Sequence, residues 1–265
     1  MEIATLVHRS VVSVEPSRSL RLAAERMAEH GVGSVVVAPE GEAAPGIFTE
    51  RDLLFALAGG ADPSTSPIES HMTKNAFTLA PSVDAMQAAT RMHVEGFRHL
   101  IVVNDDHTVA GVLSIRDLLG AVLQQIGDQR SGEGSNDEDT ESATRVKRVG
   151  DCMIPDVISV SLKTYLDKAA QAMMERRVGA AIVMDEGRVA GIVTERDLMR
   201  AVANGLVPWT TPVGECMTRK PRTITPFTTA GAALSLMMAH GFRHLPVLED
   251  GKLVGIVSMR ALASA

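Results

Sequence analysis

A hydroxyl-bearing residue and an aspartate recur three positions apart, each time after a short apolar run that begins with glycine. The three pairs are Thr49/Asp52, Ser114/Asp117 and Thr194/Asp197. At the start of a helix such a pair forms a cap, in which the hydroxyl accepts a backbone N–H and the carboxylate lies near the positive helix end. The same groups suit a nucleotide, because a helix N-terminus attracts phosphate and a carboxylate can accept both vicinal hydroxyls of a ribose. The motif therefore predicts helix caps and, as the sharper hypothesis, three nucleotide-binding positions.

These motifs belong to an internal repeat that occurs four times. The leading glycines are Gly46, Gly111, Gly191 and Gly255, so successive copies are separated by 65, 80 and 64 positions. The first and third copies resemble each other, with an offset of 145 positions between Gly46 and Gly191. The second and fourth copies also resemble each other, with an offset of 145 positions between Gly96 and Gly241. A fixed internal period indicates repeated supersecondary units. We infer that a pair of repeats was duplicated.

The second repeat shows the expected order of elements most clearly. A short strand ends at Leu79, Ser82 is the expected N-cap of a helix that ends at Gly96, and two apolar strands at 100–103 and 109–113 precede a second helix. The first helices of the other copies carry apolar residues at the same spacing, for example Leu20, Ala23, Ala24 and Met27. One such unit leaves a face of its sheet open, and two units can cover these faces together.

We therefore predict an α+β fold of four β-α-β-β-α repeats, arranged as two pseudo-twofold pairs. The expected boundaries are 1–60, 68–127, 147–205 and 211–265 for the repeats and 128–146 for a disordered acidic linker.

Composition narrows the classes of function. The net charge of −6 argues against sequence-independent binding of nucleic acid, which needs clustered Lys and Arg. The chain has no apolar run of 18 residues, so we expect no membrane span and a cytoplasmic protein. No P-loop, nucleophile pair or metal-ligand cluster is visible in the sequence. A binding protein without enzymatic activity is the expectation.

Two cysteines occupy equivalent repeat positions. Cys152 and Cys216 align with His71 of the second repeat. We interpret both cysteines as small buried residues, because two are too few for a structural zinc site. A metal site shared by these three residues remains the alternative, although no metal is expected.

The repeats resemble cystathionine-β-synthase (CBS) domains, and each pair resembles a Bateman module. The resemblance rests on the hydroxyl-bearing first strand, the Gly-x-x-[Thr/Ser]-x-x-Asp stretch and the Arg-His-Leu start of the middle strand, and it covers the chain except the linker. It implies that Asp52, Asp117 and Asp197 contact ribose, with Thr49, Ser114 and Thr194 near ribose or phosphate. It implies purine binding beside the strands that carry Ser13, Thr78 and Ser159, against the apolar neighbours Val12, Phe77 and Ile158. It also implies phosphate binding by Arg98, His99, Arg243 and His244.

The fourth repeat departs from this pattern. Ala261 replaces the aspartate and Arg222 replaces the apolar neighbour of the first strand. We expect at most three competent sites and favour the first pair of repeats, which keeps both aspartates.

These residues predict a non-enzymatic sensor that binds AMP, ADP or ATP as a regulatory ligand in clefts between paired repeats. It would signal to an unknown effector protein by a conformational change, as a homodimer or as a disc within one chain. Glu50 and Glu195, beside the motifs, are expected to repel a triphosphate. Three alternatives stay open: another adenosine ligand (S-adenosylmethionine, NADH or cyclic di-AMP), a homo-oligomeric scaffold with vestigial sites, and an enzyme acting on nucleotides.

Overall fold

The computed structural model describes residues 1–38, 44–121 and 147–263, and these fold as two compact units. The first unit holds the residues up to Thr49 and those from Thr65 to position 121, and the second holds Glu50–Ser64 and the residues from position 147 onward. The predicted acidic linker, 128–146, lies outside the described residues.

The first unit contains two three-stranded sheets with the same topology. The strands are β1 (Ser13–Val14), β2 (Ser34–Val37) and β3 (Gly46–Thr49) in one sheet, and β4 (Thr78–Leu79), β5 (His99–Val103) and β6 (Val109–Ser114) in the other. In each sheet the first strand is parallel to the middle strand, and the middle and third strands are antiparallel. The helices of this unit are α1 (Leu20–His30), α3 (Ala85–Glu95) and a helical stretch at 115–121.

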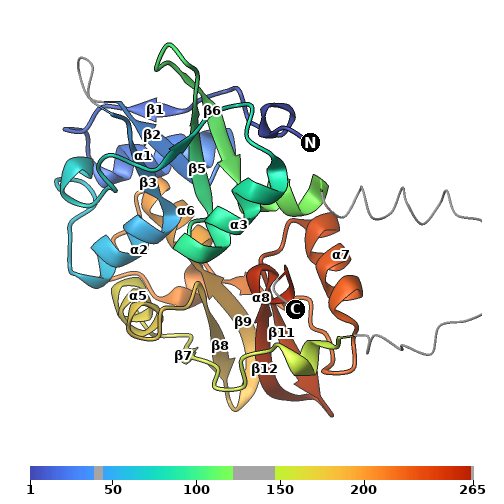
Figure 1. Cartoon of the computed structure of the whole chain (residues 1–265). Coiled ribbons are helices and arrows are strands. Elements are labelled where there is room, and N and C mark those ends of the chain that lie inside the picture. The colour runs from blue at the N-terminus through green and yellow to red at the C-terminus, as the bar shows by residue number, and fades with distance from the viewer. Residues whose placement is uncertain (39–43, 122–146, 264–265) are drawn as a thin grey trace, which may run out of the picture. The chain divides into compact units, whose positions relative to one another are not determined.

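The second unit repeats this plan. One sheet has the order β10-β9-β8-β7. A second sheet consists of the antiparallel pair β11 and β12; Figure 1 labels these two strands and β7, β8 and β9 of the first sheet. The strands are β7 (Ser159–Ser161), β8 (Ala180–Asp185), β9 (Arg188–Thr194), β10 (Thr218–Arg219), β11 (His244–Glu249) and β12 (Lys252–Ser258). Ile224 takes the place of a first strand beside β11, because it forms a parallel bridge with Val247.

The helices of the second unit include one that begins in the first repeat of the sequence. They are α2 (Glu50–Ala58), α5 (Leu166–Glu175), α6 (Glu195–Ala203), α7 (Ala230–His240) and α8 (Met259–Ala263). Helix α2 packs against α5 and α6. The predicted α+β fold of four repeats is thus confirmed.

Local sequence explains where the helices begin and end. The caps of α1 are Ser19, whose hydroxyl accepts from the backbone of Leu22, and Gly31, whose φ is +68°. Helix α3 ends as predicted at Gly96, with φ +76°. Its N-cap, however, is Asp84 rather than Ser82, because the Asp84 carboxylate accepts from the backbone N–H of Met86 at 2.8 Å.

The predicted apolar positions of the first helices form the core. Leu20, Ala23, Ala24 and Met27 of α1 have no exposed surface, and neither do their counterparts Leu166, Ala169, Ala170 and Met173 of α5. Small residues on these faces let each helix approach its sheet closely.

Each repeat opens with a 3-10 helix that belongs structurally to the other repeat of its pair. These are η1 (Ile3–Thr5), η2 (Ile68–Ser70), η3 (Val149–Asp151) and η4 (Val213–Glu215). Each 3-10 helix contributes one fully buried apolar residue to the core. The backbone N–H of this residue donates to a backbone carbonyl just before the first helix of the other repeat, as that of Ile68 does to Arg18 at 2.8 Å. The two repeats of a pair are therefore interlocked.

The segment after each of these 3-10 helices crosses the other repeat of the pair at its leading glycine. At Gly191 a Cβ atom would lie 2.8 Å from the Thr218 carbonyl oxygen, and at Gly111 it would lie 2.5 Å from that of His8. Only glycine allows this approach. We call the residues that bridge to the position after each glycine the crossing residues: Thr73, His8, Thr218 and Ile154, which bridge to Ile47, Val112, Ile192 and Ile256.

Candidate functional site

The Thr194/Asp197 pair forms a complete capping box at the start of α6. Asp197 Oδ2 accepts from Thr194 Oγ1 at 2.6 Å and from the Thr194 backbone N–H at 2.9 Å. The Asp197 backbone N–H in turn donates to Thr194 Oγ1 at 3.3 Å. The box fixes the carboxylate through Oδ2 and does not use Oδ1.

Burial of the Asp197 carboxylate makes its ionised form less favourable. Asp197 is only 9% exposed. Burial raises the pKa of Asp197 above its ordinary value, and the hydrogen bonds from Thr194 oppose that shift only in part. A carboxylate of this kind is stabilised by any added donor, such as a hydroxyl of a ligand.

The Ser114/Asp117 pair repeats the box in the first unit. Asp117 Oδ2 accepts from Ser114 Oγ at 2.5 Å and from the Ser114 backbone N–H at 3.1 Å, and the Asp117 N–H donates to Ser114 Oγ at 3.4 Å. Here the second oxygen has a partner, because His8 Nε2 lies 3.2 Å from Asp117 Oδ1. This contact between distant residues was not predicted from the sequence.

The remaining motif positions lie in the first and fourth repeats. Thr49 ends β3 and Asp52 lies in the first turn of α2, both partly exposed. In the fourth repeat, Ser258 Oγ accepts from the backbone N–H of Ala261 at 3.2 Å, so half of the box survives without a carboxylate.

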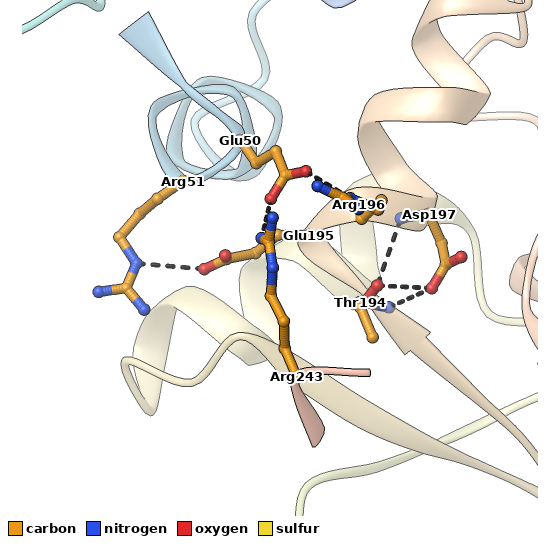
Figure 2. A network of polar contacts seen from close by, with 7 residues as sticks. All are labelled: Glu50, Arg51, Thr194, Glu195, Arg196, Asp197 and Arg243. Atoms are coloured by element: carbon orange, nitrogen blue, oxygen red, sulfur yellow. Dashed lines mark hydrogen bonds and ion pairs between the residues drawn. The ribbon is translucent and has the colours of Figure 1, made fainter. Parts of the chain in front are cut away.

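A cluster of charged side chains lies beside the Thr194/Asp197 box. The Glu50 carboxylate accepts from Arg196 Nε at Oε1, 2.9 Å away, and from Arg243 Nη1 at Oε2. Arg51 Nε donates to Glu195 Oε1 at 3.1 Å. Figure 2 shows the Glu50 carboxylate between the guanidinium groups of Arg196 and Arg243, with the capping box next to them.

The two glutamates of this cluster are buried while the arginines keep some exposure. Glu50 is 2% exposed, and Arg243 has a quarter of its side chain exposed. Burial would raise the pKa of Glu50, but Arg243 and Arg196 outweigh it, so the pKa lies below its ordinary value. The expectation that Glu50 and Glu195 repel a triphosphate is wrong, because both are buried and neutralised by arginines.

The predicted phosphate ligands lie at the starts of two middle strands. His99 and His244 begin β5 and β11, and Arg98 and Arg243 precede them; all four are partly exposed. The structure thus gives Arg243 an internal anionic partner, Glu50, that sequence reasoning missed. The sequence feature that could have pointed to this charged cluster is the Glu-Arg dipeptide, which recurs at 50–51 and 195–196.

The residues predicted to lie beside a base sit on short strands. Ser13 and Ser159 are exposed first residues of β1 and β7, and Thr78 is the partly exposed first residue of β4. Phe77, just before Thr78, is 38% exposed and lies 6.1 Å from the ring of Phe97, between centroids. Arg91 lies over the Phe77 ring at 5.3 Å. Arg91 thus covers one face of the ring, and the exposed remainder of the Phe77 side chain can contact a flat ligand.

The cysteines are half-buried rather than fully buried. The pKa of Cys216 is raised to about 11 by burial and by the nearby carboxylate of Asp197. Within the described residues, no group of three His, Cys, Asp or Glu is placed to hold a metal ion, which leaves the His71–Cys152–Cys216 alternative without support there. In the same part of the chain, no helix is long and apolar enough to cross a membrane.

Comparison with known protein families now decides the family. The CBS domain model matches four segments, residues 3–59, 68–124, 149–204 and 213–265. The chain belongs to the CBS-domain family. This membership supports a ligand-binding regulatory role.

Relatives in sequence and in structure agree with this assignment. The CBS domain-containing protein CBSCBSPB5 of Arabidopsis thaliana is 27% identical over 273 residues, which cover 94% of this chain and 50% of the relative. The chain thus spans about half the length of the curated relatives it matches. Protein MJ1225 of Methanocaldococcus jannaschii has the same fold, with a TM-score of 0.78 and 18% identity over 100% of this chain and 99% of that one. An uncharacterized conserved protein of Pyrococcus horikoshii is similar at a TM-score of 0.57 and 20% identity, with the same coverage.

Proposed function

We propose that this CBS-domain protein is a non-enzymatic sensor of adenine nucleotides, with AMP, ADP and ATP as the ligands. The observation that carries the proposal is the capping box of Thr194 and Asp197. The box fixes a buried carboxylate through Oδ2 and leaves Oδ1 outside it. A ribose presents two adjacent hydroxyl donors, and a fixed carboxylate is the acceptor that suits them.

The phosphates of such a ligand would meet Arg243. A guanidinium group can donate two parallel hydrogen bonds to a phosphate, and a quarter of the Arg243 side chain is exposed. Because the same guanidinium is bound to Glu50, a phosphate must share it or draw it away. The ligand therefore competes with an internal carboxylate.

This competition supplies a signal. Glu50 is the first residue of α2, and Arg243 directly precedes β11. A ligand that loosens their contact favours conformations in which α2 is held less firmly. It shifts this equilibrium only by the difference in its affinity for the two forms. An effector protein that binds one form would then respond to the nucleotide.

Thermal unfolding of the full chain with a panel of ligands tests this proposal. The panel contains AMP, ADP, ATP, NADH, S-adenosylmethionine and cyclic di-AMP at about 1 mM each. A ligand present at 100 times its Kd adds about 2.7 kcal/mol to the free energy of unfolding, and this raises Tm by several degrees. We expect a rise with an adenine nucleotide that is reduced in Asp117→Asn and Asp197→Asn.

Asp84→Asn is the matched control, because Asp84 caps α3 outside the motif. Its nucleotide-induced rise in Tm should equal that of the natural protein. A rise in Tm only with NADH, S-adenosylmethionine or cyclic di-AMP would show that the ligand is that compound rather than AMP, ADP or ATP. No rise with any of them would favour a structural scaffold with vestigial sites.

A further inference from the structure

We propose that His8 is a specificity-determining residue of the Ser114/Asp117 position: its imidazole hydrogen-bonds the carboxylate oxygen that a ribose needs, so a riboside binds there in competition with it. This inference rests on the proposed function. It goes beyond that function because it makes the Ser114/Asp117 and Thr194/Asp197 positions unequal in affinity.

The geometry of Asp117 accounts for both of its oxygens. Oδ2 is taken by the hydroxyl and the backbone N–H of Ser114. Oδ1 lies 3.2 Å from His8 Nε2. A diol that approaches the carboxylate therefore meets the imidazole at the acceptor it requires.

The position of His8 is set by the backbone rather than by its side chain. His8 and Val112 exchange both backbone hydrogen bonds, at 3.1 and 3.3 Å. This bridge is the one that every crossing residue makes, so any residue at position 8 would stand beside the motif. The backbone bridge therefore does not require histidine at position 8, and the histidine side chain can be explained by its contact with Asp117.

Comparison of the four crossing residues shows that the histidine is particular to one site. Thr73 and Thr218 bridge the strands that lead into Thr49/Asp52 and Thr194/Asp197. Ile154 bridges the strand that leads into Ser258/Ala261. The crossing residue is thus polar wherever the motif has its aspartate, and it is apolar in the one repeat where alanine replaces it.

Exposure makes displacement of His8 feasible. Its side chain is 66% exposed, whereas that of Asp117 is 19% exposed. An exposed imidazole can turn into solvent at little cost, while the carboxylate stays fixed by its box. His8 therefore lowers the affinity of this position without closing it, and the protein responds over a wider range of ligand concentration than two equal sites would allow.

The test measures AMP affinity by titration calorimetry in the full chain carrying Asp52→Asn and Asp197→Asn, so that only the Ser114/Asp117 carboxylate remains. In this background His8→Thr introduces the residue that two other repeats carry at the crossing position. We expect it to lower the Kd for AMP roughly three- to tenfold, the effect of removing one partly exposed charge-assisted hydrogen bond. His8→Gln, which keeps an N–H donor, should stay within about twofold of the background.

A ligand without the diol provides the control. With 2′,3′-dideoxyadenosine 5′-monophosphate, His8→Thr should leave the Kd unchanged, because this probe does not need Asp117 Oδ1. The inference is overturned if AMP binds the background protein and His8→Thr does not tighten it, or if the dideoxy probe gains as much as AMP. If neither the natural protein nor its His8→Thr variant binds AMP at all, the proposed function itself fails.

Discussion

Arg196 donates from Nε to the buried carboxylate of Glu50 at 2.9 Å, and the same contact occurs in reverse 145 positions away. Arg51 donates from Nε to Glu195 at 3.1 Å, and each of these residues is the repeat counterpart of one in the first pair. Helices α2 and α6 thus meet through equivalent residues, as in an isologous interface between two subunits. A duplication of one Glu-Arg dipeptide provides both halves of such a contact at once.

Removing the buried charge at the centre of this cluster should destabilise the protein. Glu50→Gln leaves Arg196 and Arg243 without their anionic partner, and we expect the free energy of unfolding to fall by about 2–3 kcal/mol in denaturant titrations. Glu25→Gln is the control, because Glu25 pairs with Arg21 on an exposed helix face, where such pairs contribute about 0–1 kcal/mol. Equal losses in the two variants would contradict the importance given to Glu50.

The raised pKa of Asp197 predicts a pH dependence of stability. A carboxyl whose pKa is higher in the folded state binds protons more readily there, so ionisation costs stability above the folded pKa and that cost is relieved as pH falls. Asp197→Asn removes this titration. The stability of the natural protein relative to Asp197→Asn should therefore increase as pH falls from neutral through the pKa of Asp197. Urea unfolding of both proteins over this range measures the difference, and a difference that decreases would contradict the assignment.

The glycine at each crossing should not tolerate a side chain. In Gly191→Ala the new Cβ would lie 2.8 Å from the backbone oxygen of Thr218, and we expect a loss of about 2 kcal/mol or more. Gly231→Ala is the control in the same unit, since nothing lies within 4 Å of a Cβ at that position of α7. Its stability should be unchanged or raised by up to about 1 kcal/mol. Two variants of equal Tm would show that the crossing segments do not require glycine.

The thiol of Cys216 should react slowly in the folded protein. With a pKa of about 11, only about one thiol in a thousand is ionised at pH 8, and the thiolate is the reactive form. In Cys152→Ser, modification by Ellman's reagent should rise about tenfold per pH unit up to at least pH 10. In denaturant, where Cys216 is no longer buried, the modification at pH 8 should be fast. A plateau near pH 9 in the folded state would contradict the raised pKa.

Contacts within a few residues could be predicted from the sequence, and contacts between distant segments could not. The caps of Ser114/Asp117 and Thr194/Asp197 were predicted because their partners lie three positions apart. Glu50 was misjudged because its partner Arg243 is 193 positions away. His8 was missed for the same reason, since Asp117 is 109 positions away.

The glycine period illustrates the same limit at the level of the fold. It identified the repeats, yet it did not show that each glycine admits a segment from the other repeat of the pair. That requirement comes from the interlocked opening turns, whose buried residues such as Ile3 and Ile68 look unremarkable in the sequence. Phosphate binding by Arg98, His99 and His244, and base binding beside Ser13, Thr78 and Ser159, remain predictions.

Titration calorimetry with AMP tests the central claim most directly, using the natural protein, Asp117→Asn, Asp197→Asn and the double variant. Asparagine retains an acceptor for the capping box but loses the charge that a ribose would meet. We predict that the natural protein binds AMP and that each single variant weakens one class of site tenfold or more. The double variant should keep only the binding that the Thr49/Asp52 position provides, while its unfolding stays cooperative. AMP binding that is undiminished in the folded double variant would contradict the account.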